Sequence, residues 1–164
     1  MAKARPIPDL MAEEPYASAA AKIVAVRARE VSEHSHDVVD VSDIERVHDM
    51  RVATRRLRAA LEIFEPCLPR KEYAAALDEV KALADALGER RDRDVTLAAL
   101  EDFVSAIAAP DRPGIETLIE GLRAEQLEAN EALGSFVTAE RLAGLNELVF
   151  ELVASARGMA APQV

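Results

Sequence analysis

The chain has 164 residues and a formal net charge of −10, with 30 acidic side chains against 20 basic ones. This length suits one domain with a real core, and an apolar half of the residues excludes disorder throughout. An acidic chain argues against general coating of nucleic acid. No apolar run approaches the roughly 20 residues of a membrane span, and the N-terminus lacks the apolar region of a secretory signal. We therefore expect a cytoplasmic protein without a membrane segment.

Proline positions divide the chain into segments that can be helical. The eight prolines leave 16–65, 70–109 and 114–161 uninterrupted, and an interior proline would cost a helix roughly 3 kcal/mol. Within these segments the apolar residues recur at helical spacing, and aromatic residues make up only 4 % of the chain. The pattern predicts an all-α fold, an antiparallel bundle of about four to six helices over residues 15–157. Residues 1–14 and 158–164 are expected to be flexible tails.

Local signals predict where the first helices begin and end. The first helix should start near Tyr16 and end in the stretch 34–40. Ser42, with Glu45 three residues later, predicts a capping box at the start of the second helix. Gly88 predicts the end of a third helix, and an aspartate soon after it predicts the start of a fourth.

The later helices are predicted from their apolar stripes. The fourth helix should turn Leu100, Phe103, Val104 and Ile107 inward. The stripe of the fifth consists of Ile115, Leu118, Leu122, Ala129, Leu133 and Phe136. That of the sixth consists of Leu142, Leu145, Val149, Leu152 and Ala156.

The segment IERVHDMRVATRRLRAALEIF, residues 44–64, concentrates arginine in an otherwise acidic chain. On a helical wheel the side opposite its apolar face carries His48, Arg51, Arg55 and Arg58 within an arc of about 80°, and Arg56 lies on the other flank of His48. Asp49 is the only acid within residues 46–58, so ion pairs inside the helix cannot neutralise the row. Because arginine binds phosphate or carboxylate in a bidentate manner, this face indicates an external anion.

A second group of charges follows Gly88 in the stretch GERRDRDV, which contains Arg90, Arg91 and Arg93 together with Asp92 and Asp94. Two interpretations stay open. In the first, the aspartates cap the start of a helix. In the second, an aspartate orients an arginine of the preceding helix while the new arginines extend the anion site.

Other chemistry is sparse in the sequence. His34 and His36 could suggest a metal site, but side chains two residues apart on a helix point about 200° apart. No catalytic Ser-His-Asp pattern, phosphate-binding glycine loop or zinc-protease motif is present. The sequence therefore predicts no catalytic residue, no metal site and no cofactor.

The segment VHDMRVATRRLRAALEIF, followed by LGERRDRDV, resembles the CHAD family, the conserved histidine α-helical domain. The resemblance runs from about Tyr16 to Arg157. It implies a helical bundle that binds inorganic polyphosphate through a basic surface. The residues implied in that surface are His48, Arg51, Arg55, Arg56, Arg58, Arg90, Arg91 and Arg93. In the second interpretation of the charge pattern, Asp92 and Asp94 support them.

The resemblance is to one half of the family's domain. Full-length members contain two related halves, whereas residues 111–164 hold no histidine and no second arginine cluster. A homodimer could restore the missing surface, with the final helix as its interface. We expect non-catalytic polyphosphate binding. The alternatives are a metal-dependent phosphate-handling enzyme, using His48 with Asp49 or the His34–Asp37 stretch, and a helical module that docks on an acidic protein.

Overall fold

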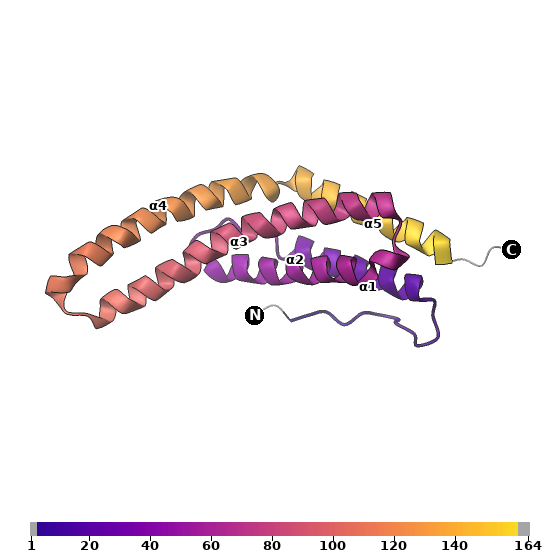
Figure 1. Cartoon of the computed structure of the whole chain (residues 1–164), viewed down its shortest axis with the longest axis horizontal. Coiled ribbons are helices and arrows are strands. Elements are labelled where there is room, and N and C mark those ends of the chain that lie inside the picture. Colours follow the sequence, from indigo (N-terminus) through magenta and orange to yellow (C-terminus); the bar gives the residue numbers. More distant parts are fainter. Residues whose placement is uncertain (1–2, 161–164) are drawn as a thin grey trace.

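The computed structural model describes residues 3–160, the last two of these by their backbone alone. Figure 1 shows a chain built from helices, and the described residues contain no strand, which confirms the all-α prediction. Single 3₁₀ turns precede α3 and α4. The helices are α1 (Tyr16–Glu33), α2 (Ile44–Phe64), α3 (Arg70–Ala106), α4 (Arg112–Phe136) and α5 (Ala139–Ala160).

A four-helix bundle holds most of the core. Helix α1 packs on α2 and α5, and α3 completes the ring by packing on α2 and α5 in turn. The fully buried side chains at the centre come from all four helices, and they include Val24, Met50, Leu57, Leu87 and Leu152. Their burial supplies the main stabilisation of the bundle, at about 25 cal/mol per Å² of apolar surface.

The second half of α3 leaves the bundle and pairs with α4 as a two-helix arm (Figure 1). A pair of helices has one apolar seam, so most of the arm's surface faces solvent. Within the arm, Leu97 and Ile119 are buried, whereas Phe103 and Leu118 are each 52 % exposed. The prediction that Phe103 points inward was therefore wrong, because no further helix covers that side of α3.

Two predicted helix boundaries differ from the structure. The N-cap of α2 is Asp43, whose carboxylate accepts a hydrogen bond from the Glu45 N–H at 3.2 Å, so the capping box at Ser42 was wrong. Aspartate is as good an N-cap as serine and lies next to the helix. Gly88 does not end a helix, because it lies inside α3, which has 37 residues in all and ends at Ala106. The penalty of about 1 kcal/mol for an interior glycine is offset by a buried stripe that continues to Leu97.

The apolar face of α5, which had suggested a dimer interface, packs inside its own bundle. Leu145, Val149 and Leu152 are all buried against α1 and α3. The final helix therefore does not offer these residues to a second copy. Homodimer formation through another surface stays a prediction.

The segment before α1 lies along that helix. The Arg5 N–H donates to the buried Glu30 carboxylate at 2.5 Å, and Arg27 donates to the Arg5 carbonyl at 3.0 Å. Further along, the Lys22 ammonium donates to the Asp9 carbonyl at 2.5 Å. These contacts fix the course of residues 5–14 in the structure, while the flexibility of this tail in solution stays a prediction. The predicted C-terminal tail lies partly in α5 and partly outside the described residues.

Candidate functional site

Helix α2 presents two chemically different faces, as its sequence predicts. Val47, Met50, Leu57 and Leu61 are fully buried, and the Thr54 hydroxyl donates to the Met50 carbonyl at 2.9 Å. The buried threonine is thereby satisfied within its own helix, and the core side stays free of unpaired polar groups. The arginines lie away from this core side, in the order set by the helical period.

Three of the predicted arginines line one wall of a groove between α2 and α3. The groove encloses about 510 Å³. We call Arg51, Arg55 and Arg58 the arginine wall. Their spacing of four and three residues brings them to one side of α2, with Arg55 about 6 Å and Arg58 about 10 Å beyond Arg51 along the axis. The α3 residues Ala84 and Gly88 also line this groove.

The arginines of this wall differ in how strongly they are already bound. Arg58 donates to Glu62 on the next turn at 2.9 Å, and this bond is the main reason that the pKa of Arg58 is raised. Among the described residues, no hydrogen bond or ion pair engages the side chain of Arg51 or Arg55. Arg55 is exposed and Arg51 is half-buried. Two of the three guanidinium groups are thus ready to bind an anion without first losing a partner.

His48 and Arg56 belong to the same helix but not to the groove lining. His48 is half-buried and lies one turn before Arg51. Arg56 is turned toward α1, where its charge helps to lower the pKa of Glu30. Burial, the largest single influence, raises that pKa, but hydrogen bonds from the Arg5 N–H and from Arg27, together with the charges of Arg27 and Arg56, outweigh it. Arg56 therefore serves partly as a counter-charge to a buried carboxylate.

The structure places Arg90 in the interior instead of at the surface. Its side chain is fully buried and pairs with Asp94, one turn later on α3. Gln126 of α4 donates to the same Asp94 oxygen at 2.6 Å. Burial lowers the pKa of Arg90, and the neighbouring Arg91 lowers it further. Neither Arg90 nor Asp94 can contact an anion in the groove, so the proposed site leaves both out.

The remaining charges of the GERRDRDV stretch have separate positions. Arg91 donates to the Ile44 carbonyl at 3.1 Å and lies 3.5 Å from Glu45, so it fixes the first turn of α2 against α3. Arg93 is bound to Glu89 at 2.5 Å and lies 3.7 Å from Glu125 of α4. Asp92 lines the groove opposite the arginine wall. The first of the two open interpretations was wrong, since both aspartates lie in the middle of α3 and cap no helix. As for the second, no bond joins Asp92 or Asp94 to an arginine of α2 among the described residues, and Asp94 is bound to Arg90 and Gln126.

Of the residues on the acidic side of the groove, only Asp92 was predicted from the sequence. Asp85, Glu89 and Asp92 of α3 line it, and we call them the acidic wall. A signal for them exists in the sequence, because they repeat at the same intervals of four and three residues as the arginines. It could be used only once α2 and α3 were known to lie side by side.

A set of three metal-binding residue types lies at the start of α2. The ligand atoms of Glu45, His48 and Asp49 all lie within 4.8 Å of one another. Glu45 also faces the guanidinium of Arg91 at 3.5 Å, which competes with a cation for the carboxylate. These residues could supply the nitrogen and two oxygens of a divalent-metal site.

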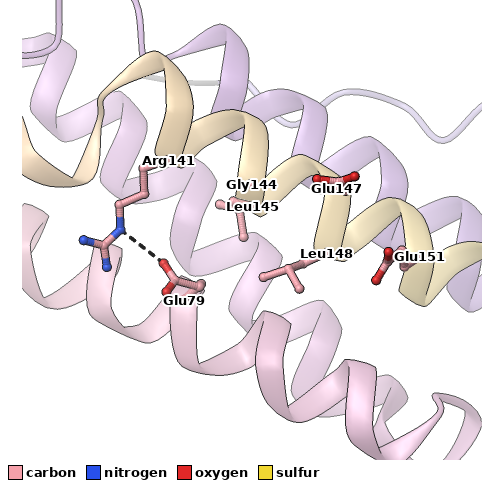
Figure 2. A pocket seen from close by; sticks show the side chains of 7 residues that line it. All are labelled: Glu79, Arg141, Gly144, Leu145, Glu147, Leu148 and Glu151. Carbon is pink, nitrogen blue, oxygen red and sulfur yellow. Dashed lines mark hydrogen bonds and ion pairs between the residues drawn. The ribbon is translucent and has the colours of Figure 1, made fainter.

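A second concavity, between α3 and α5, is shown in Figure 2. Its single arginine, Arg141, is held by Glu79 at 3.3 Å and stacks on Phe136 at 4.2 Å. The rest of the lining is apolar or acidic, with Glu147 and Glu151 along α5. A phosphate entering here would meet carboxylates and an arginine that is already paired. The groove between α2 and α3 is the better anion site.

Comparisons with known proteins identify the same family as the sequence of the arginine-rich helix does. Residues 22–163 match the family model described as CHAD domain. A stretch of 79 residues is 37 % identical to the uncharacterized protein Rv2226 of Mycobacterium tuberculosis (strain ATCC 25618 / H37Rv). This alignment covers 47 % of the chain and only 15 % of that protein's length. None of the helices in residues 3–160 combines the length and apolar character needed to cross a membrane, and a cytoplasmic location stays a prediction.

Proposed function

Because the chain belongs to the CHAD domain family, we propose that it binds inorganic polyphosphate, or a similar phosphate-rich polyanion, without turning it over. The observation that carries the proposal is the arginine wall, in which Arg51 and Arg55 have no bound partner among the described residues. Guanidinium groups form charge-assisted, bidentate bonds with phosphate oxygens. A linear polymer can contact several of them in sequence along one helix.

Binding without hydrolysis requires the fewest functional groups of this site. Polyphosphate binding needs a row of cations, whereas hydrolysis needs a metal ion or a positioned base in addition. The groove lining consists of arginines, carboxylates and small residues. His48 is adjacent to the arginine wall and would extend it by one turn as a further donor to phosphate.

The test is a titration with polyphosphates of graded length at two salt concentrations. With about four phosphate contacts, a fourfold rise in salt should weaken binding roughly fiftyfold, because each contact releases counterions. The double variant Arg51→Glu/Arg55→Glu should lose at least about a hundredfold in affinity, since each charge-assisted bond contributes roughly 1.5–3 kcal/mol.

A matched control is available elsewhere on the surface. Arg70 and Arg157 are exposed and lie outside the groove. The variant Arg70→Glu/Arg157→Glu changes the net charge by the same amount and should keep most of the affinity. Equal losses in the two double variants, or affinity independent of salt, would contradict a specific arginine site.

Glu45, His48 and Asp49 favour one second candidate, a metal-dependent phosphate-handling enzyme. Incubation of the protein with long-chain polyphosphate and Mn²⁺ or Mg²⁺ separates the two functions. Binding alone predicts no release of phosphate above the rate without protein. Release that disappears in His48→Ala would support the enzyme. The third hypothesis, docking on an acidic protein, predicts that polyphosphate displaces the partner from the arginine wall.

A further inference from the structure

The groove between α2 and α3 carries opposite charges on its two helices. Helices α2 and α3 are joined by a short turn and run antiparallel (Figure 1). Arg58 lies near enough to Asp85 for this carboxylate to help raise its pKa, although Glu62 is the main cause. Arg51 and Asp92 both belong to the lining of the same groove.

The formal charge of the groove lining is therefore zero, with three arginines against three carboxylates. Glu89 is neutralised by Arg93 at 2.5 Å. In the described part of the chain, Asp85 and Asp92 have no hydrogen bond or ion pair through their side chains. A polyphosphate bound on the arginine wall would thus lie in the same groove as two carboxylates that form no bond of their own. Such repulsion between like charges opposes binding of the bare anion.

A divalent cation on the polymer would remove this conflict. Mg²⁺ prefers oxygen ligands, and proteins usually hold it through one or two carboxylates together with phosphate oxygens of the ligand. The acidic wall could not hold the ion alone, because Asp85 and Asp92 are separated by about 10 Å along α3. Each can contact only a cation that the polymer brings with it.

We propose that Asp85 and Asp92 are specificity-determining residues, which make the groove selective for polyphosphate complexed with Mg²⁺ over the bare polymer. The arginine wall binds phosphate oxygens, and the two aspartates face the polymer-bound cations. This inference rests on the proposed polyphosphate binding. It also reverses the usual expectation, because a purely cationic surface binds a polyanion less tightly when a divalent counterion competes for it.

The test compares the affinity for one length-defined polyphosphate with and without Mg²⁺ at constant ionic strength. The wild type should bind the Mg²⁺-loaded polymer roughly tenfold more tightly, as expected for relief of repulsion at two exposed sites. The variant Asp85→Asn/Asp92→Asn should bind the bare polymer more tightly than the wild type does. It should also lose the preference for Mg²⁺.

Two controls make the result specific. Asp78 and Asp102 are exposed on the same helix and outside the groove, so Asp78→Asn/Asp102→Asn removes the same charge and should retain the preference. Glu45→Gln should retain it as well. Loss of the preference in Glu45→Gln would assign the cation to the Glu45–His48–Asp49 group and overturn the proposal. Weaker binding of the wild type with Mg²⁺ would overturn it too.

Failure of this inference is distinguishable from failure of polyphosphate binding itself. If Arg51→Glu/Arg55→Glu binds as tightly as the wild type, the proposed function fails, and the inference falls with it. If that variant loses binding while Asp85→Asn/Asp92→Asn keeps the wild-type response to Mg²⁺, only the role of the acidic wall is wrong. Far-UV circular dichroism should be unchanged in all of these surface variants.

Discussion

Arg90 and Asp94 form an ion pair across one turn of α3, and neither side chain is exposed to solvent. Replacing Arg90 with Met should lower the free energy of unfolding by about 3–5 kcal/mol, because the buried carboxylate is left with Gln126 as its only bound partner among the described residues. The double variant Arg90→Met/Asp94→Leu should recover much of this loss, since it removes both buried charges. Urea denaturation measures both changes.

The same variants test where Arg90 acts. A buried structural arginine predicts that the double variant, once folded, binds polyphosphate as tightly as the wild type. If it is stable but binds much more weakly, Arg90 contributes to the anion site after all.

Gly88 offers a stabilising substitution in the middle of α3. No glycine in the described residues has a positive φ angle, and a Cβ built on Gly88 would meet nothing within 4 Å. Gly88→Ala should therefore raise the free energy of unfolding by about 0.5–1 kcal/mol through helix propensity. A thermal or urea transition shows the gain. Loss of stability would mean that the groove at this position is narrower than the structure has it.

Leu57 distinguishes the core face of α2 from its arginine face. Its side chain is fully buried, so Leu57→Asp should destabilise the bundle by at least about 4 kcal/mol through lost apolar burial and a buried charge. Leu57→Met, which keeps the volume, should cost less than about 1.5 kcal/mol. Circular dichroism during denaturation separates the two. A folded Leu57→Asp protein that fails to bind polyphosphate would contradict this division of the faces.

Acid should release the segment that precedes α1. The folded-state pKa of Glu30 lies below its ordinary value of 4.5, and that of Glu14 is lowered to about 2, chiefly by the Met11 N–H. A lowered pKa stabilises the folded state above pH 4.5. This contribution disappears as the pH falls from 4.5 toward 2.

The variant Glu30→Gln tests this linkage. It removes charge-assisted bonds to Arg5 and Arg27 and should lower stability at pH 7 by about 1–3 kcal/mol. Its stability should then fall less steeply than that of the wild type between pH 4.5 and pH 2. Parallel pH profiles for the two proteins would contradict the role assigned to Glu30.

The buried face of α2 could be predicted because this helix packs on both α1 and α3. A regular stripe such as Val47, Met50 and Leu57 then has one physical interpretation. The arm does not meet this condition. Phe103 follows the same spacing, yet it is exposed because only one helix packs on that part of α3.

The candidate site was predictable on one side only. Residues four and three positions apart on α2 must share a face, so the arginine wall follows from helical geometry alone. Which of Arg90, Arg91 and Arg93 is buried depends on where α4 lies and on the contact of Gln126 with Asp94. Asp85 became a site residue only through the antiparallel pairing of two helices, which a helical wheel for one helix cannot represent.

Helix α3 belongs to two surroundings at once, the bundle at its beginning and the arm at its end. Amide hydrogens near Val80, Leu83 and Leu87, which lie in the bundle core, should exchange with deuterated water only when most of the domain opens. Those near Phe103 need only the end of the arm to separate, because one helix covers them. Exchange rates should therefore increase along this single helix from its N-terminal half to its C-terminal end. Ala84, Asp85 and Gly88 of the groove adjoin this slowly exchanging segment, so this part of the groove is held in place before a polymer arrives.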